Sequence, residues 1–226
     1  MEKVSRLFRN AVRSARRSLG LSPMQKVLRR LQAREIDLGS LHALELFGGS
    51  GAFHTVDYLD KVASLEVWEI DPNLEDSLRS NLPKATIRIV NCYDEIMRTR
   101  HRFNLVIVDN PMSTYDGRCE HFDLFPDLFR VARDQAVLLL DVIPRVPPAA
   151  QKKYPYLFNE EQRQRRSKFY NLATADNLSW DEIISAYRER ADRAGFEVEW
   201  SFMVRRHFVY YLALKIRRKN SASEVR

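Results

Sequence analysis

Short apolar segments alternate with stretches of helical periodicity between residues 42 and 141, and this alternation constrains the fold more than any other feature of the sequence. The strand candidates lie at 42–47, 65–70, 85–90, 103–108 and 136–141. The helix candidates lie between them, at about 51–60, 72–81, 93–98 and 122–132. Strands that alternate with helices predict crossover connections, and therefore a parallel sheet whose two faces are both covered by helices.

The C-terminal part of the sequence predicts a different connection. Ser179 and Glu182 form a capping box that opens a helix, and this helix ends near Gly195. The strand candidates 196–203 and 208–215 follow with only a short turn between them, which is typical of an antiparallel hairpin. Together, these segments predict a three-layer α/β fold around a mixed sheet of seven strands, six of them parallel and one reversed.

The length of 226 residues fits one α/β domain with extensions. We expect a basic helical extension over residues 1–36 and a main domain over residues 37–226. The extension includes a helix that starts at Ser22, with Pro23 in its first position. An insertion at about 144–178 interrupts the alternation, because it holds four prolines and mixes basic with aromatic side chains.

The net charge of +7 is distributed unevenly along the chain. Residues 1–36 hold ten Lys or Arg against two Asp or Glu, and residues 215–226 hold five against one. Residues 37–214, in contrast, hold 22 basic against 27 acidic side chains. Enzymes that act on nucleic acids usually concentrate positive charge around the active-site groove, so this distribution disfavours a nucleic-acid partner without excluding it.

Cysteine content and the lengths of apolar runs bear on the compartment. The two cysteines, Cys92 and Cys119, are too few for a disulfide framework and belong to no metal-type cluster. No apolar run is long enough to cross a bilayer, and the N-terminus lacks the apolar core of a secretory signal. We therefore expect a cytoplasmic protein with no transmembrane segment and no bound metal.

The first 20 residues predict an amphipathic helix whose arginines lie mainly off a stripe of Val, Leu, Phe and Ala side chains. The interpretation we favour is a helix that packs on the main domain as a cap. Three alternatives stay open: peripheral contact with an anionic membrane surface, a transit peptide, and binding to the phosphates of a nucleic acid.

The segment Ala43–Phe53 carries the sharpest motif, a hydrophobic strand that runs into the turn Phe-Gly-Gly-Ser-Gly. In parallel α/β folds ligands bind at the carboxyl ends of the strands, and glycines let the backbone approach them closely. A dinucleotide-binding turn would continue as G-x-G-x-x-G. Here Gly49 and Gly51 are followed three residues later by His54, so a pyrophosphate site is disfavoured.

A second motif stands at the end of the next strand candidate, where Glu69 and Asp71 flank Ile70. An acid at this position accepts hydrogen bonds from the ribose hydroxyls of a nucleoside. Glu69 follows Gly51 by 18 residues, close to the roughly 20 that one helix and one strand occupy. We therefore expect Glu69 to bind a ribose, with Asp71 as the second choice.

These motifs and their order resemble the cofactor half of class I (Rossmann-like) S-adenosylmethionine-dependent methyltransferases. Glu45–Gly51 looks like the first motif of that family, and Glu69–Pro72 looks like its ribose-binding motif. Asn91–Asp94 stands where the family contacts adenine, and Asn104–Pro111 looks like the fourth motif, beside the transferred methyl group. The resemblance implies that S-adenosylmethionine is held by Glu45, Phe47, Gly48, Gly49, Ser50, Gly51, Glu69, Ile70, Asp71, Cys92, Tyr93, Asp94 and Asp109.

Three positions depart from patterns known in the family. Phe47 replaces the usual first glycine of the turn, a change that nucleic-acid methyltransferases with Leu-Phe-x-Gly-x-Gly turns tolerate. The acid on the adenine side is displaced, so that Asp94 would fill this role one position late. Asp109–Met112 lacks the second proline and the aromatic residue of the Asp/Asn-Pro-Pro-Tyr/Phe motif, which disfavours methylation of base amino groups.

Methyl transfer is an in-line displacement that needs aligned reactants and, for a hydroxyl or amine, removal of a proton. The candidate catalytic residues are Asp109, Asn110 and His121, of which Asp109 is the best placed. Asp109 would alternatively cap its loop or bind the cofactor amine, and His121 would alternatively face solvent or start a helix. Asp109 and Asp141 would supply two ligands of a Mg²⁺ site, but Val142 stands where metal-dependent O-methyltransferases carry asparagine.

The acceptor is the part of the function that the sequence determines least. The insertion at 144–178 would lie over the carboxyl edge of the sheet. It is either a lid that selects an anionic or sugar-like acceptor, or a solvated helix whose aromatic side chains pack on the body. We expect methyl transfer to an oxygen or nitrogen of a small-molecule or saccharide-like acceptor. The alternatives are methylation of an RNA or DNA base, and a non-catalytic adapter that keeps the fold.

Overall fold

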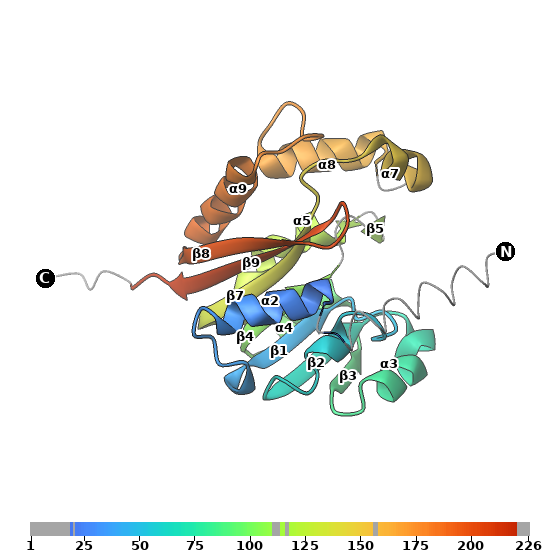
Figure 1. The fold of residues 1–226 in the computed structure, drawn as a ribbon, viewed down its shortest axis with the longest axis vertical. Coiled ribbons are helices and arrows are strands. Elements are labelled where there is room, and N and C mark those ends of the chain that lie inside the picture. Colours follow the sequence, from blue (N-terminus) through green and yellow to red (C-terminus); the bar gives the residue numbers. More distant parts are fainter. Residues whose placement is uncertain (1–18, 20, 110–113, 116–117, 156–157, 221–226) are drawn as a thin grey trace, which may run out of the picture.

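A computed structural model describes residues 19, 21–109, 114–115, 118–155 and 158–220 of the chain. Its main strands are β1 (His42–Leu46), β2 (Ser64–Glu69), β3 (Thr86–Ile89), β4 (Phe103–Val108), β7 (Ala132–Val142), β8 (Phe196–Arg205) and β9 (Tyr210–Arg218). They form one seven-stranded sheet in the order β3-β2-β1-β4-β7-β9-β8 (Figure 1). A separate pair contains β5 (Thr114–Tyr115) and β6 (Arg118–Cys119).

The sheet confirms the predicted mixed topology. β1 pairs in parallel with β2 and β4, β3 continues the parallel set beyond β2, and β7 continues it beyond β4. β9 runs antiparallel to both of its neighbours, β7 and β8. Six strands therefore share one direction and one strand is reversed. The hairpin strands and β7 are longer than the sequence predicts, because both extend beyond their apolar centres.

Helices lie on both faces of the sheet. The α-helices are α2 (Pro23–Gln32), α3 (Glu75–Asn81), α4 (Cys92–Arg98), α5 (Glu120–Leu124), α6 (Leu128–Val131), α7 (Pro148–Lys153), α8 (Glu160–Tyr170) and α9 (Trp180–Arg193). The 3-10 helices are η1 (Leu38–Ser40), η2 (Thr55–Asp57), η3 (Pro72–Leu74) and η4 (Phe125–Asp127). The capping box predicted at Ser179 is present before α9, and α2 begins after Ser22 as predicted, with a capping box between Ser22 and Gln25.

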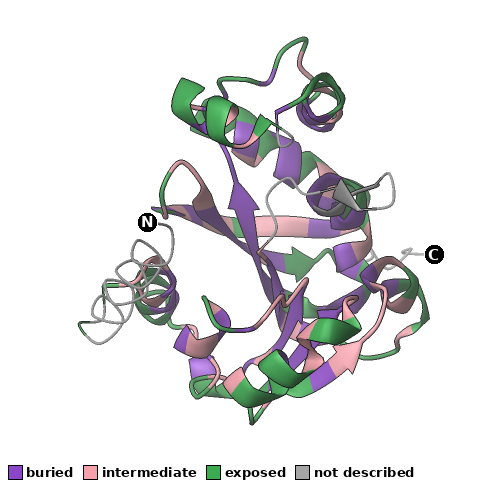
Figure 2. Cartoon of the chain, turned by 90° about the vertical axis from the view of Figure 1, so that its right-hand side faces the viewer, coloured by how far each residue is buried: buried purple, intermediate pink, exposed green. Residues whose placement is uncertain are grey.

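Two cores divide the buried side chains between the two faces of the sheet. On one face, alternate strand residues such as Leu44, Val106 and Leu138 pack with α4, α5, α6, α8 and α9. On the other, the intervening residues such as Ala43 and Leu139 pack with α2 and α3. The strands are mostly buried, whereas exposed residues gather on the outer helices (Figure 2). This division follows from the period of two along a strand, and it fixes which side chains can meet at the carboxyl edge.

Two helix predictions are wrong in part. The segment predicted as a helix at 51–60 contains only turns and the single 3-10 turn η2. Its inward side chains Thr55 and Tyr58 bind a buried carboxyl group on β1 instead of continuing a helical stripe. The segment predicted at 122–132 is broken into α5, η4 and α6. Pro126 lies at the break, where it has no N–H to donate to a continuing helix.

The insertion packs against the rest of the molecule at two places. The aromatic rings of Phe169 and Tyr170 on α8 are buried in the main core, as expected for packing on the body. α7 instead joins a small separate core with Ile143 and Phe158, and Phe208 from the β8–β9 turn packs against it. The insertion is therefore attached to the body at α8, and α7 lies beside the hairpin turn.

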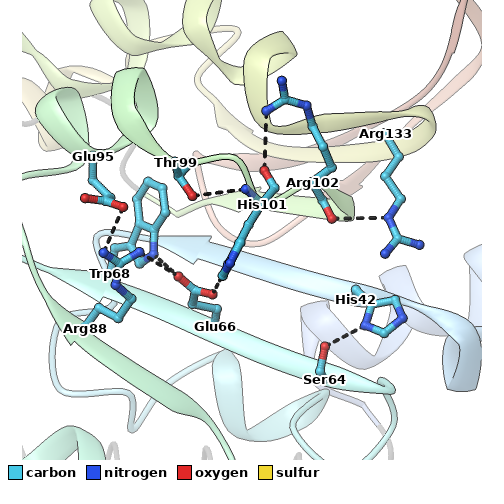
Figure 3. A network of polar contacts seen from close by, with 10 residues as sticks. All are labelled: His42, Ser64, Glu66, Trp68, Arg88, Glu95, Thr99, His101, Arg102 and Arg133. Carbon is cyan, nitrogen blue, oxygen red and sulfur yellow. Dashed lines mark hydrogen bonds and ion pairs between the residues drawn. The ribbon is translucent and has the colours of Figure 1, made fainter.

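A network of polar side chains links β2 and β3 to α4 (Figure 3). Glu66 accepts hydrogen bonds from Trp68 Nε1 at 2.6 Å and from Arg88 Nη1 at 3.2 Å. Arg88 also forms an ion pair of 2.8 Å with Glu95 on α4. The network ties β2, β3 and α4 together, so the loop that enters α4 has a fixed position relative to the end of β2.

Most of the N-terminal amphipathic segment, residues 1–18 and 20, lies outside the described residues. Within the described ranges, no helix is both long enough and apolar enough to cross a membrane.

Candidate active site

The Gly-rich turn after β1 depends on a left-handed backbone. Phe47, Gly49 and Gly51 have φ angles of 61°, 56° and 71°, a conformation that glycine adopts freely and other residues rarely adopt. A Cβ atom on Gly51 would lie 2.7 Å from Leu82 Cδ1. On Gly49, in contrast, it would meet no atom within 4 Å. Gly49 therefore presents bare main chain to open space at the carboxyl edge of the sheet.

The turn is anchored to the neighbouring strand. The amide of Gly48 donates a 3.0 Å hydrogen bond to the carbonyl of Trp68 on β2. A Cβ atom on Gly48 would lie 2.2 Å from Val67 Cγ1, so only glycine fits there without a shift of the strand. Asn81 Nδ2 donates a 2.9 Å bond to the carbonyl of Ser50. These contacts fix the main chain of the turn against β2.

Glu69 lies at the end of β2 and its carboxylate faces the turn. Oε2 accepts the amide of Gly49 at 2.7 Å, and Oε1 accepts the amides of Ile70 and Asp71 at 2.8 and 3.0 Å. A carboxylate has about four lone-pair positions, so Oε2 retains one for a further donor. The Asp71 carboxylate instead accepts bonds from the amide and side chain of Asn73. Glu69 is thus the better oriented of the two acids.

The residues expected on the adenine side separate into three positions. Phe47 and Tyr93 are half-buried and come together, with their ring centroids 6.5 Å apart. Asn91 caps α4 by accepting the amide of Tyr93 at 2.9 Å. The Cys92 side chain is buried in the core, and Asp94 is exposed on the first turn of α4. Within the Asn91–Asp94 motif, Tyr93 is therefore the residue that can contact a ligand ring, together with Phe47 from the Gly-rich turn.

Four polar side chains interrupt the apolar face that α2 covers. Strand periodicity places Glu45 of β1, Asp109 after β4 and Asp141 of β7 on this face. Tyr211 of β9 is the register partner of Asp141 and joins them. We call these residues, Glu45, Asp109, Asp141 and Tyr211, the polar row. Glu45, Asp109 and Asp141 lie near the carboxyl ends of parallel strands, where ligands bind in parallel α/β folds, and Tyr211 lies at the start of the reversed β9 beside Asp141.

Glu45 closes one end of the polar row. Its carboxyl oxygens accept hydrogen bonds from Thr55 Oγ1 at 3.0 Å and Tyr58 Oη at 2.6 Å. Burial raises the pKa of Glu45 to about 8, with a further contribution from the charge of Asp109, although the two hydrogen bonds oppose the shift. Glu45 therefore holds the segment after the Gly-rich turn against the sheet, and it is largely protonated at neutral pH.

Arg206, from the β8–β9 turn, bridges the two aspartates of the polar row. Its Nη1 atom lies 2.5 Å from Asp109 Oδ1 and 2.8 Å from Asp141 Oδ2. Burial and then the charge of Asp109 raise the pKa of Asp141 well above its usual range. Burial opposes ionisation of Asp109 too, but a hydrogen bond with Asp141 and the charges of His54 and Arg206 lower its pKa. The two shifts have opposite directions, so within this pair Asp141 holds a proton more tightly than Asp109 does.

His54 and Tyr211 complete the cluster around Asp109. His54 Nε2 lies 3.2 Å from Asp109 Oδ2, and the His54 ring meets the Tyr211 ring edge-on at 5.6 Å. The Tyr211 hydroxyl is buried and has no hydrogen-bond partner among the described residues. Burial, followed by the charges of Asp109 and Asp141, raises the pKa of Tyr211, so its proton stays in place.

The three candidate catalytic residues do not come together. Asp109 lies in the polar row, and Asn110 lies outside the described residues. His121 is buried on the opposite face, 2% exposed, and its Nε2 lies 2.5 Å from Tyr187 Oη on α9. Burial, and then the charge of Arg166, lowers the pKa of His121 to about 3. This burial disagrees with the interpretations of His121 as a base and as a solvent-facing residue, whereas its place in the first turn of α5 agrees with the third interpretation, a helix start.

Three residues that contact the polar row lie outside the sequence motifs and were not predicted. Thr55 and Tyr58 lie in a segment that we interpreted as a helix, and Arg206 lies in what we interpreted as a simple hairpin turn. A usable indication existed for Asp141 and Tyr211, because a polar residue at the end of a buried strand requires a partner. Arg206, which is remote in sequence, had no such indication.

The Asp109–Asp141 pair, considered above as a metal site, is occupied by a side chain. The Arg206 guanidinium lies between the two carboxylates and contacts both. In the part of the chain that the structure describes, no group of three or more His, Cys, Asp or Glu side chains has the arrangement of a metal site.

Comparison with known proteins gives structural matches only. No protein-family model and no curated protein matches this sequence. The solved structures include magnesium protoporphyrin IX methyltransferase from Synechocystis PCC 6803 with bound S-adenosylhomocysteine, at a TM-score of 0.56 and 16% identity, covering 87% of this chain and 81% of that one. A candidate RNA methyltransferase from Pyrococcus horikoshii matches at a TM-score of 0.50 and 12% identity, covering 88% and 83%.

These matches confirm the resemblance at the level of the fold. The chain has the Rossmann-like fold of class I S-adenosylmethionine-dependent methyltransferases, with the mostly parallel sheet and the C-terminal antiparallel hairpin. The two neighbours named here differ in the kind of acceptor that their names give.

Proposed function

We propose that the protein is an S-adenosylmethionine-dependent methyltransferase that acts on an oxygen or nitrogen of a small-molecule or saccharide-like acceptor. The observation that carries the proposal is the contact between the two nucleoside motifs, in which Glu69 Oε2 accepts the Gly49 amide at 2.7 Å. This contact aligns an open Gly-rich turn with a strand-end acid in a chain of the methyltransferase fold.

The residues around this contact fit the parts of the cofactor. The lone pair left on Glu69 Oε2 suits a ribose hydroxyl. The half-buried rings of Phe47 and Tyr93 suit the faces of an adenine. The bare main chain at Gly49 leaves room for the methionine part to pass over the turn. When bound, S-adenosylmethionine supplies a methyl group on a positively charged sulfur and leaves as neutral S-adenosylhomocysteine.

The Asp109 carboxylate of the polar row is better suited to positioning other side chains than to removing a proton from the acceptor. Asp109 has a lowered pKa, and its two oxygens face Arg206 and His54, so it is a weak proton acceptor. We assign to Asp109 the role of orienting the Arg206 and His54 side chains beside the acceptor. His54, which Asp109 holds at 3.2 Å, is the ring better placed to take a proton from an acceptor hydroxyl or amine when its imidazole is neutral.

A second candidate function is methylation of an RNA or DNA base. The basic residues of α2 and of the β8–β9 turn favour it, and the Leu-Phe-Gly-Gly-Ser-Gly sequence of the turn is compatible with it. The missing second proline and aromatic residue after Asp109 disfavour it. A test of binding to RNA at low and high salt separates the two candidates, since phosphate contacts make binding strongly salt-dependent.

Calorimetric titration with S-adenosylhomocysteine, beside NAD, tests the proposal. We expect saturable binding of S-adenosylhomocysteine and none of NAD. Binding of NAD alone would contradict the proposal, as would the absence of S-adenosylhomocysteine binding in protein shown to be folded. The latter outcome would favour a non-catalytic adapter.

A further inference from the structure

Three cavities lie next to one another around the turn between β8 and β9. They have volumes of about 630, 580 and 430 Å³. Arg205 lines all three, Tyr210 lines the first and second, and Lys26 lines the second and third. Since they share these lining residues, we treat the three neighbouring cavities as one site, which we call the basic groove. Its positively charged lining residues are Lys26, Arg29, Arg30, Arg145, Arg205 and Arg206.

The groove contains no carboxylate of its own. Among the described residues that line the three cavities, none is Asp or Glu. Glu182 is close in sequence to the lining residue Ser179, but its carboxylate is engaged in capping α9. Residues 37–214 as a whole carry more acidic than basic side chains. The absence of acids from this lining is therefore a local property of the groove and does not follow from the composition of the body.

Two of the groove cations, Arg145 and Arg205, differ from arginines elsewhere on the surface. Arg79, Arg165 and Arg218 each form an ion pair with a carboxylate. Within the described residues, Arg205 donates only to the carbonyl of His207, and the Arg145 side chain has no polar partner. A cluster of cations without carboxylates has an unfavourable self-energy that a bound anion relieves.

Aromatic side chains line the same groove. Trp180 is 46% exposed, and its ring meets the Tyr210 ring edge-on at 4.9 Å. Phe208 lines the first and third cavities. Exposed rings of this kind pack against the faces of sugars or bases, with cations beside them for charged groups.

The groove continues to the polar row. Arg206 lines the third cavity, and the same guanidinium binds Asp109 and Asp141. A ligand in the groove therefore lies one side chain away from the carboxyl edge, where the proposed methyl transfer occurs.

We propose that the basic groove is the acceptor site and that the acceptor is a phosphate-bearing saccharide, whose phosphates contact Arg205, Arg145 and Lys26 while its ring packs on Trp180. The statement that this ligand is the methyl acceptor rests on the proposed function. The binding of a phosphate-bearing saccharide in the groove does not. Arginine forks suit phosphate oxygens in a bidentate manner. Each cavity also falls within the range of about 300–1,000 Å³ that is typical of small-ligand sites.

Binding of uridine diphosphate glucose to the full chain tests the proposal, with glucose as the uncharged control and a 12-residue oligouridylate as the polymeric control. Titration calorimetry measures affinity, and tryptophan fluorescence, compared between the native chain and Trp180→Phe, provides a second readout in the groove. We compare Arg205→Ala and Arg145→Ala with Arg217→Ala, which lies on the same hairpin but pairs with Glu197 and Glu199 outside the groove. S-adenosylhomocysteine is titrated in parallel into every variant.

We expect uridine diphosphate glucose to bind and glucose to bind far more weakly. Each groove variant should lose about 10-fold in affinity, the equivalent of one charge-assisted hydrogen bond. Arg217→Ala should not change the affinity, and S-adenosylhomocysteine binding should be retained throughout. Retained S-adenosylhomocysteine binding without any uridine diphosphate glucose binding would overturn the inference but leave the proposed function intact. Oligouridylate that binds far more tightly, with a steep salt dependence, would overturn it in favour of a nucleic acid.

Discussion

The backbone amide of Gly49 donates a 2.7 Å hydrogen bond to Glu69 Oε2, and this contact joins the Gly-rich turn to the end of β2. The two residues are 20 positions apart in sequence. Gly49 has a left-handed backbone at this contact, with φ of 56°. Glu69 therefore supports the turn and is also the acid best oriented to receive a ligand hydroxyl.

Replacement of Glu69 by alanine should weaken S-adenosylhomocysteine binding by about 10- to 100-fold. The change removes a charged acceptor from both the ligand and the Gly49 amide, and hydrogen bonds to charged groups contribute about 1.5–3 kcal/mol. Asp71→Ala is the matched control, because the Asp71 carboxylate accepts bonds from Asn73. Calorimetry measures both affinities. A larger loss in the Asp71 variant than in the Glu69 variant would show that Asp71, and not Glu69, binds the ribose.

Gly48→Ala should lower the free energy of unfolding by about 1–3 kcal/mol, the usual effect of an overpacked site. The added Cβ would lie 2.2 Å from Val67 Cγ1 inside the parallel sheet. Gly39→Ala is the control, since its Cβ would have an ordinary contact of 3.4 Å with Asp37 Oδ1. Urea unfolding of the two variants measures the difference, and equal stabilities would show that the strand yields to the methyl group.

The sequence predicted the sheet well because strand period and helix capping are local properties. The seven strands, the reversed β9 and the caps at Ser22 and Ser179 all follow from neighbours within a few residues. The helix predicted at 51–60 failed because its decisive contacts are with Glu45, which lies outside that segment. A periodicity argument cannot detect a side chain that turns inward to a buried acid.

The candidate site was predictable only where a motif concentrates its residues. Gly49 and Glu69 came from compact motifs, and the structure brings them together. Arg206 and Asp109 are 97 positions apart in sequence. Their contact depends on the pairing of β9 with β7, which brings the β8–β9 turn to the edge of the sheet where Asp109 lies. His121 was misassigned because proximity in sequence to Asp109 does not reveal that the two side chains lie on opposite faces of the sheet.

Arg206→Gln should lower stability by about 3 kcal/mol at pH 8, the lower end for breaking a buried ion pair, because Arg206 is partly exposed. The loss should diminish as the pH falls, since protonation of Asp141 removes the repulsion between the two aspartates. Adding Asp141→Asn should restore part of the stability at pH 8. Chemical unfolding at pH 5 and 8 measures both effects, and a loss independent of pH would show that repulsion between ionised Asp109 and Asp141 is not its cause.

His121→Phe should reduce the loss of stability in mild acid. In the native protein the pKa of His121 is lowered from 6.5 to about 3, so the unfolded chain binds a proton that the folded chain does not. This group therefore stabilises the fold above pH 6.5, and its contribution falls by up to about 1.4 kcal/mol per pH unit as the pH drops. Unfolding between pH 7 and 5 should show a shallower slope in the variant. The exposed His207→Phe should behave as the native chain does.

Glu45→Gln should have the opposite pH signature. The pKa of Glu45 is raised from 4.5 to about 8, so the folded chain holds a proton that the unfolded chain has released. The contribution of Glu45 is therefore complete below pH 4.5 and falls as the pH rises toward 8, again by up to about 1.4 kcal/mol per unit. Glutamine resembles the protonated acid in shape, so the variant should lose this dependence while keeping its contacts with Thr55 and Tyr58. Unfolding of the cofactor-free protein between pH 5 and 8 measures it. If native and variant slopes were equal, Glu45 would be ionised in the fold, and the polar row would then carry one more negative charge beside Asp109.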